Sequence, residues 1–200
     1  MKDSPMSLND TALIVFVRNP VAGKVKTRLA AEVGNEKALA IYLELLAITR
    51  NLALEFDGPR YLYYSEALEA GDAWPAEHFN KRVQQGNSLG DRMHSALCEV
   101  LACHAAALLI GSDCPALRLS DLSDASASLR DADLVLGPAA DGGYYLIGMK
   151  RPHACAFEGI TWSSPGVLDQ TLAVLDDEGL KWSLLRKLRD VDTYSDWLNV

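Results

Sequence analysis

The chain has 200 residues, 49% of them hydrophobic, which is enough apolar material for one packed α/β domain over residues 1–200. Its formal net charge of −8 at pH 7 argues against nucleic-acid binding through a broad basic surface. No apolar run approaches the roughly 18 residues of a membrane span, so we expect no transmembrane segment.

The polar start of the chain and its cysteines indicate a cytoplasmic protein. Residues 1–11 read as a disordered lead-in without the apolar region of a secretory signal. The cysteines form no CxxC pair and have no histidine at zinc-ligand spacing, so we expect free thiols. Free thiols without a signal peptide are typical of the cytoplasm. The four residues are Cys98, Cys103, Cys114 and Cys155.

A basic loop follows the first predicted strand, the apolar run LIVFV at residues 13–17. Pro20 and Gly23 interrupt regular structure in this loop. Cations and free backbone N–H groups before a helix suit an anion, so we expect phosphate binding here, with a solvated basic loop as the alternative. The cations are Arg18, Lys24, Lys26 and Arg28.

This loop matches neither of two common phosphate motifs. Arg18 stands where a Walker P-loop has its first glycine, and Val25 stands where that motif has serine or threonine. The dinucleotide-binding pattern GxGxxG is absent as well. A P-loop kinase and an NAD dehydrogenase are therefore both disfavoured.

The next stretch begins with a long helical pattern and ends in a glycine-bracketed turn. Ser88 can cap the helix that follows this turn, and Arg92 lies in the first turn of that helix. The loop can cradle a nucleobase, or it can be only a turn with surface residues. The predicted elements before it are a helix at 36–56, a strand at 60–65, a short helix and loop at 66–80, and a short strand at 82–85.

The central strand is the short apolar run at residues 107–110, which should be buried on both faces of a parallel sheet. Gly111 and Pro115 break the regular structure around Asp113. Asp113 should therefore emerge at the carboxyl end of the strand, where open α/β sheets bind ligands. A carboxylate there suits a divalent cation, although Asp113 can also be a simple turn residue.

Two further loops carry candidate site residues. Asp141, Gly142 and Gly143 mark either a hairpin turn or a close approach of the backbone to a ligand. Tyr144 and Trp162 can line an acceptor pocket, or they can serve core packing. The predicted elements here are a helix at 120–130 with Ser120 as N-cap, strands at 133–137 and 144–149, and a helix capped by Ser164 with Pro165 at its first position.

The chain closes with two alternating acids, Asp190 and Asp192, after a minor strand at 184–185. On an extended segment both carboxylates point to the same side. Asp192 or Thr193 can also cap the final helical turn, and this capping is compatible with metal binding.

Six segments in the same order resemble the nucleotide-diphospho-sugar transferase superfamily. Within it, the chain is similar to a small bacterial family of radical-SAM/selenodomain-associated, DUF-type transferases. The resemblance implies a three-layer α/β/α sandwich with a Rossmann-like, glycosyltransferase-A-type, mostly parallel sheet. The segments are RNPVAGKVKTRL, QGNSLGDRM, LLIGSDCPAL, LVLGPAADGGYYLIG, ITWSS and RDVDTYSDWL.

The resemblance also implies roles for named residues. In that superfamily the first loop binds nucleotide phosphates, which points here to Arg18, Lys24, Lys26 and Arg28. The acid after the central strand binds Mg²⁺ or Mn²⁺, which matches Asp113, and a later acid completes the metal site. Asp192 is the first candidate for that acid and Asp190 the second.

The resemblance leaves the reaction open. Many glycosyltransferases carry Asp-x-Asp where this chain has Ser112-Asp113-Cys114, with one carboxylate. We therefore expect nucleotidyl transfer from a nucleoside triphosphate to a small phosphorylated or hydroxyl acceptor. The alternatives are glycosyl transfer from a nucleotide-sugar, with Asp141 as acceptor base, and a nucleotide-binding module without turnover.

Overall fold

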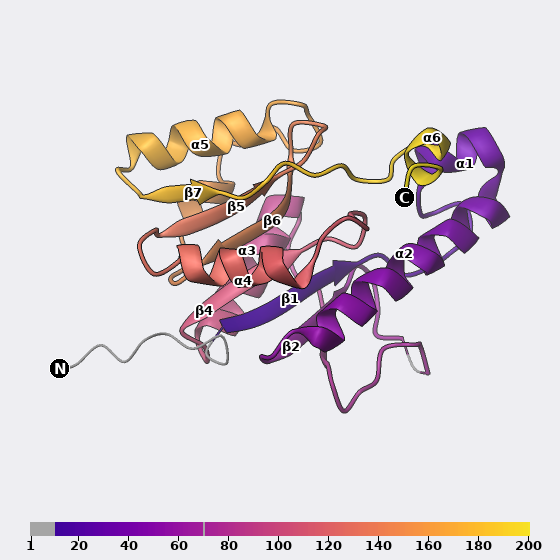
Figure 1. Cartoon of the computed structure of the whole chain (residues 1–200), viewed down its shortest axis with the longest axis horizontal. Coiled ribbons are helices and arrows are strands. Elements are labelled where there is room, and N and C mark those ends of the chain that lie inside the picture. The colour runs from indigo at the N-terminus through magenta and orange to yellow at the C-terminus, as the bar shows by residue number, and fades with distance from the viewer. Residues whose placement is uncertain (1–10, 70) are drawn as a thin grey trace.

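The computed structural model of the chain describes residues 11–69 and 71–200 (Figure 1). The predicted lead-in lies outside these residues except for Thr11, which is already the first residue of a strand. Within the described residues a seven-stranded sheet has the order β3-β2-β1-β4-β6-β5-β7. The strands are β1 (Thr11–Val17), β2 (Arg60–Tyr64), β3 (Asn80–Val83), β4 (Ala106–Ile110), β5 (Leu134–Pro138), β6 (Tyr144–Met149) and β7 (Trp182–Leu184).

The sheet is mixed but mostly parallel, as predicted. Only β6 runs antiparallel to its neighbours β4 and β5, while the other four pairings are parallel. Of the two alternatives for Asp141–Gly143, the hairpin turn is present, because the segment joins the antiparallel strands β5 and β6. The predicted α/β class and glycosyltransferase-A-like architecture are confirmed.

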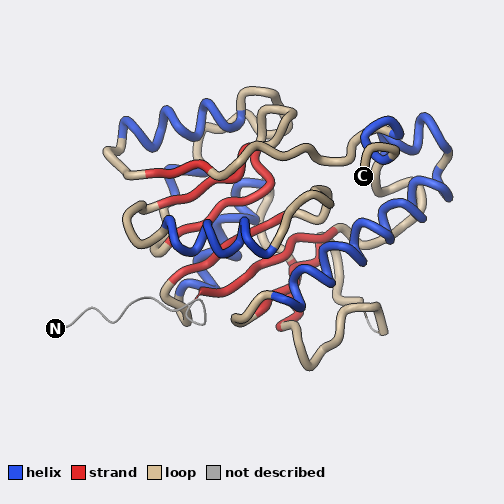
Figure 2. Tube along the Cα trace, in the orientation of Figure 1, coloured by secondary structure: helices blue, strands red, loops and turns tan. Residues whose placement is uncertain are grey.

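Helices cover both faces of the sheet, which gives three layers (Figure 2). One face packs against α2 and α4, and the other packs against α3, η2 and α5. Neighbouring residues of β1 alternate between the two core clusters, and this is why the strand is apolar throughout. The bounds are α1 (Thr27–Val33), α2 (Asn35–Glu55), α3 (Leu89–Leu101), α4 (Leu119–Ser128), η2 (Ala154–Phe157), α5 (Val167–Asp177) and α6 (Tyr194–Trp197).

A third apolar cluster lies beyond the sheet, where α1, α6 and the start of α2 meet at one end of the molecule (Figure 1). Leu29 of α1 and Ile41 of α2 are buried in this cluster, and Val191 of the closing segment joins them. The burial of Val191 fixes the chain just before α6. It therefore also fixes the positions of Asp190 and Asp192, the residues directly before and after Val191 in the chain.

The sheet order places two loops together. From β1 the chain first builds β2 and β3 on one side, and then it crosses to β4 on the other side. The carboxyl ends of the neighbouring strands β1 and β4 therefore form the topological switch point of the sheet, the usual place for a ligand in such folds. The basic loop follows β1, and Asp113 follows β4.

Two predicted helix caps are wrong. Helix α4 begins at Leu119, one residue before the predicted cap Ser120, because the Asp121 carboxylate accepts the Arg118 N–H at 2.8 Å. Helix α5 begins at Val167 after Gly166. The hydroxyl of Ser164 instead donates to the Thr161 carbonyl at 2.7 Å within the preceding turn.

The predicted helix between residues 66 and 80 is also absent from the described part of that stretch, which consists of turns before β3. No helix of the described residues is long and apolar enough to cross a membrane.

The turn at Gly142 should be intolerant of a side chain. Its φ is +94°, and a Cβ added there would lie 1.9 Å from the Pro165 carbonyl oxygen. We expect Gly142→Ala to lower the free energy of unfolding by about 2 kcal/mol or more, through backbone strain and overpacking. Urea unfolding measures this loss. Gly111→Ala is the matched control, because nothing lies within 4 Å of its added Cβ, and an equal loss in both variants would contradict the assignment.

Candidate functional site

A cavity of about 740 Å³ opens at the carboxyl ends of β1 and β4. Its volume falls within the range of about 300–1,000 Å³ that small-molecule and cofactor sites occupy. The basic loop, the segment after β4 and the closing segment supply one end of its wall, and the loop before α3 supplies the other. The sheet order thus brings together four segments that lie far apart in the sequence.

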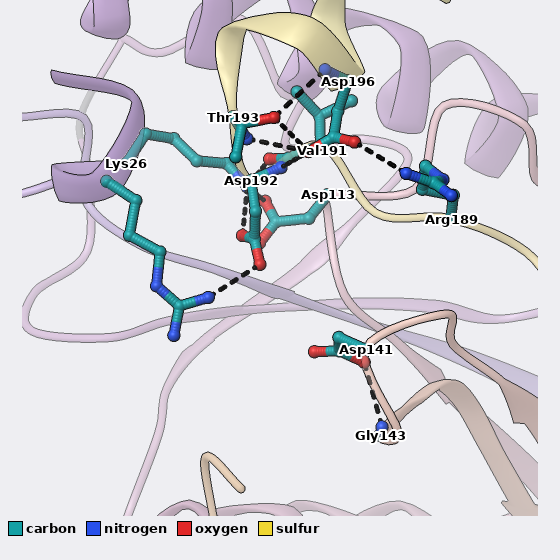
Figure 3. A network of polar contacts seen from close by, with 10 residues as sticks. Lys26, Asp113, Asp141, Gly143, Arg189, Val191, Asp192, Thr193 and Asp196 are labelled. Carbon is teal, nitrogen blue, oxygen red and sulfur yellow. Dashed lines mark hydrogen bonds and ion pairs between the residues drawn. The ribbon is translucent and has the colours of Figure 1, made fainter. Parts of the chain in front are cut away.

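Lys26 is the centre of the charged end of this cavity (Figure 3). Its ammonium donates to the Val191 carbonyl oxygen at 2.7 Å and pairs with Asp113 Oδ1 at 3.0 Å. Asp192 Oδ1 lies 4.0 Å from the same nitrogen. Only 7% of the Lys26 side chain is exposed, whereas Asp113 and Asp192 are 45% and 36% exposed, so the ammonium is buried while water still reaches both carboxylates.

The backbone of Lys26 is unusual for a lysine. It adopts the left-handed conformation, with φ 48° and ψ 49°, at the start of α1. A non-glycine residue in this region costs free energy, and such residues cluster at functional sites. The conformation turns the chain from the loop into α1 and directs the Lys26 side chain toward the two acids.

The other three cations of the loop also line the cavity, but they are more exposed. Arg28 pairs with Asp192 Oδ2 at 3.2 Å and is 74% exposed. Lys24 Nζ lies 3.7 Å from Glu66 Oε2, and Glu66 also lines the cavity. Arg18 follows β1 directly, and no ion pair of its guanidinium is seen within the described residues. All four predicted cations therefore face one cavity.

Tyr42 of α2 holds the start of the basic loop in place. Its hydroxyl accepts the Arg18 N–H at 2.8 Å and donates to the Arg18 carbonyl at 3.0 Å. Burial raises the pKa of Tyr42 to about 12, so the hydroxyl stays protonated and keeps both roles. The helical spacing of Tyr42 indicates only a core residue, and nothing in the sequence signals this contact with the loop.

The closing segment reaches the cavity because its backbone is tied to the segment after β4. The Val191 N–H donates to the Asp113 carbonyl at 2.9 Å. Asp190 and Asp192 both line the cavity, as their alternation predicts, while the Val191 side chain packs on the other side. Thr193, one of the two predicted candidates, caps α6, where its hydroxyl accepts the Asp196 N–H.

Asp190 is the most perturbed acid of the site. Burial, together with the charges of Asp113, Asp141 and Asp192, raises its pKa to about 7, and the charge of Lys26 partly opposes this. Its Oδ1 atom is buried without a hydrogen-bond partner among the described residues. An acid in this setting carries a proton more readily than its neighbours do.

This raised pKa predicts a pH-dependent stability. The folded protein holds the Asp190 proton up to about pH 7, whereas the unfolded chain releases it near pH 3.9. Stability should therefore fall as pH rises between these values, by at most about 4 kcal/mol. Asp190→Asn removes the titration, so the variant should gain stability over the wild type at pH 8 and match it near pH 4. Urea unfolding in chelator tests this, and a gain independent of pH would contradict it.

The donor set around Lys26 fits a hard divalent cation. Asp113, Asp192 and the Val191 carbonyl all present oxygen atoms, the ligands that Mg²⁺ and Mn²⁺ prefer. Among the described residues no group of three or more His, Cys, Asp or Glu side chains is arranged to hold a metal ion. The fit therefore depends on two carboxylates and a main-chain oxygen.

The far end of the cavity is formed by the loop before α3. Ser88 caps α3 by accepting the Asp91 N–H at 3.1 Å, as predicted. The Nε of Arg92 donates to the Gly86 carbonyl at 3.1 Å, which folds that side chain back onto its own loop. Both residues line the cavity together with Asn87. These polar groups stand across the cavity from the basic loop.

Of the site residues predicted around the β5–β6 hairpin, only some line the cavity. Tyr144 lines the cavity, but Asp141, Gly142 and Gly143 are not among its lining residues. Asp141 accepts the Gly143 N–H at 2.9 Å within the turn, apart from the Lys26 cluster (Figure 3).

Trp162 lies outside the cavity wall as well. It stacks on Phe157 with ring centroids 6.5 Å apart and meets Tyr144 edge-on at 6.4 Å. A Cβ added at Gly90 would lie 2.7 Å from the indole ring, so Gly90 leaves room for it. These contacts are those of core packing.

Comparison with known proteins identifies relatives of this fold. The model of the family described as "Uncharacterized protein conserved in bacteria (DUF2064)" matches residues 48–164. A structure from Desulfovibrio desulfuricans G20, which bears the provisional name nucleotide-diphospho-sugar transferase, is 31% identical, with a TM-score of 0.84. The match covers 92% of this chain and 83% of that one. None of the curated proteins compared with the chain matches it in sequence.

More distant structures share the fold alone. CMP:2-keto-3-deoxy-manno-octonic acid synthetase complexed with CTP is 11% identical, with a TM-score of 0.58, and the match covers 94% of this chain and 95% of that one. The manganese complex of Rv0371c from Mycobacterium tuberculosis H37Rv is 15% identical, with a TM-score of 0.56, and the match covers 94% and 96%. The likeness to the 31% identical structure and the family match agree, and the chain belongs to the DUF2064 family.

Proposed function

We propose that this protein is a metal-dependent nucleotidyltransferase, which transfers a nucleoside monophosphate from a nucleoside triphosphate to a small phosphorylated or hydroxyl acceptor. The observation that carries the proposal is the charged end of the cavity. There Lys26 contacts Asp113 and lies near Asp192, and Arg28 adds a second cation. In a chain of net charge −8, this concentration of cations suits a polyanionic ligand.

The basic loop is suited to hold the phosphates. Lys24, Lys26 and Arg28 all line the cavity; Lys24 and Lys26 precede α1, and Arg28 lies in its first turn. They would neutralise the charge that develops on the pyrophosphate as it leaves. About three quarters of the Arg28 side chain is exposed, so a ligand in the cavity can reach its guanidinium.

A divalent cation would be held by Asp113 and Asp192, with the Val191 carbonyl as a third oxygen donor. The cation supplies charge neutralisation on the phosphates when it is bound. Its presence in the manganese complex of the distant relative Rv0371c is consistent with this proposal. The same residues support Mg²⁺ equally well.

For this reaction the protein has to position the two reactants, and it needs no covalent nucleophile of its own. An acceptor oxygen attacks the α-phosphorus of the triphosphate, a new P–O bond forms, and the bond to pyrophosphate breaks. In this proposal the acceptor would bind near Tyr144 and Ser163, which line the cavity and carry no positive charge. A phosphorylated acceptor needs no separate base, since its oxygen is already ionised.

Glycosyl transfer from a nucleotide-sugar is the second candidate. The provisional name of the 31% identical structure favours it. Against it, the segment after β4 carries one acid, Asp113, and Asp141 is engaged in its own turn rather than lining the cavity. An acceptor base is therefore harder to assign for this reaction.

A thermal-unfolding screen tests the proposal. Nucleoside triphosphates and nucleotide-sugars are added with and without Mg²⁺, beginning with CTP, because the synthetase relative was solved with it. A ligand at about 100 times its Kd should stabilise the fold by about 2.7 kcal/mol. Stabilisation by a triphosphate, followed by pyrophosphate release with an acceptor, supports nucleotidyl transfer. Preference for a nucleotide-sugar favours the second candidate, and the absence of any nucleotide effect contradicts both.

A further inference from the structure

Lys26 occupies the position between the two acids that would hold a divalent cation. Its ammonium donates to the Val191 carbonyl at 2.7 Å and pairs with Asp113 Oδ1 at 3.0 Å, and Asp192 Oδ1 lies 4.0 Å away. These are the same oxygens that fit the metal. A monovalent ammonium and a divalent ion cannot occupy this place together, because their charges repel and their ligands are shared.

We propose that Lys26 takes the place of the divalent cation while no nucleotide is bound. Its ammonium then neutralises Asp113 and Asp192, and nucleotide binding draws the ammonium away to the phosphates. This inference rests on the proposed function, because the nucleotide supplies the competing anion. It goes beyond that function by making Lys26 the residue that couples metal binding to nucleotide binding.

The surroundings of Lys26 favour such an exchange. Two carboxylates close together without a cation repel each other, which is unfavourable for the folded site. Lys26 removes that penalty in this structure, and its side chain is only 7% exposed. The side chain begins on the cavity wall at the start of α1, so a rotation about its own bonds can carry the ammonium toward a ligand in the cavity.

The consequence is a thermodynamic coupling. A metal ion that arrives before the nucleotide must displace Lys26, so its affinity is low. A nucleotide that engages Lys26 frees the two acids, so the metal then binds more tightly, and by linkage the metal tightens the nucleotide equally. Removal of the ammonium should raise metal affinity without nucleotide and reduce the coupling.

Arg28 offers a matched control. It also carries one positive charge and also contacts Asp192, at 3.2 Å, but no contact between it and Asp113 is found among the described residues. If only the net charge near the acids matters, Lys26→Met and Arg28→Met should raise the affinity for the metal alike. If Lys26 instead competes with the metal for the position between Asp113 and Asp192, only Lys26→Met should raise the affinity for the metal.

The experiment measures Mn²⁺ binding to the full chain without nucleotide, by the electron paramagnetic resonance signal of free Mn²⁺. We expect Lys26→Met to bind Mn²⁺ at least about tenfold more tightly than the wild type, and Arg28→Met to change affinity much less. The double variant Lys26→Met/Asp192→Asn should lose the gain. Circular dichroism confirms that each variant is folded, and Lys26→Gln replaces Lys26→Met if that variant unfolds.

Equal or weaker Mn²⁺ binding in a folded Lys26 variant would overturn the inference, and so would an equal gain in both single variants. The result is separable from the proposed function. If nucleotides fail to bind the wild type while Lys26→Met gains Mn²⁺ affinity, the proposed function fails and the role of Lys26 at the acids remains. If nucleotide and Mg²⁺ bind together while the variant gains nothing, only this inference fails.

Discussion

Replacement of Asp113 by asparagine is expected to abolish the dependence of nucleotide binding on Mg²⁺. Asp113 is the acid nearest to Lys26, and its backbone is fixed to the closing segment through the Val191 N–H. In the wild type, Mg²⁺ should tighten nucleotide binding roughly 5- to 150-fold, the usual range of coupling between two ligands. Asparagine keeps the shape but lacks the charge that a divalent cation needs. Calorimetric titration with and without Mg²⁺ measures the effect.

Two comparisons sharpen this prediction. Asp192→Asn should reduce the effect of Mg²⁺ without removing it, because Asp192 is farther from the shared position. Glu66→Gln should leave the effect intact, since Glu66 lines the cavity but pairs with Lys24 and not with Lys26. A wild-type response to Mg²⁺ in Asp113→Asn would show that the metal, if it binds, is held elsewhere.

The second large effect concerns the basic loop itself. Lys26→Ala should weaken nucleotide binding about 10- to 100-fold at saturating Mg²⁺, because a hydrogen bond to a charged group contributes about 1.5–3 kcal/mol. Arg28→Ala should weaken it less, since Arg28 is well exposed and its interactions are screened by water. The same titration checks both variants. Unchanged affinity in both, with the fold intact, would remove the phosphate role from this loop.

The sequence predicts those site residues that directly follow the end of a buried strand. The apolar runs of β1 and β4 mark buried strands, and the residues that follow them must emerge at one edge of the sheet. Asp113 and the basic loop were placed by this rule, and both line the cavity. The alternation of Asp190 and Asp192 likewise predicts their shared side, because Val191 between them is apolar.

The remainder depends on contacts that side-chain patterns do not encode. The Val191 carbonyl contacts Lys26 through the main chain, which every residue type has. The left-handed backbone of Lys26 cannot be predicted from the sequence, because glycine or asparagine, and not lysine, normally indicates such a conformation. Tyr42 belongs to the apolar face of α2 by its spacing, and only the fold shows that its hydroxyl reaches Arg18.

Local competition between caps explains the errors at helix starts. Ser120 and Ser164 both match the composition of an N-cap. At the first, the Asp121 carboxylate fixes the Arg118 N–H and also pairs with Arg186 at 2.6 Å, so the helix starts earlier. At the second, the Pro165 carbonyl packs against Gly142, and this contact keeps the residues before Val167 in a turn. In each case one partner, Arg186 in the first and Gly142 in the second, lies far away in the sequence.

The most direct test of the account is a crystal structure of the protein with Mn²⁺ and CTP, in which the anomalous signal locates the metal. We predict one Mn²⁺ between Asp113 and Asp192, with phosphate oxygens completing its ligands and the Lys26 ammonium on the phosphates instead of between the acids. A nucleotide outside the cavity of β1 and β4, or a metal that touches neither Asp113 nor Asp192, would contradict the account.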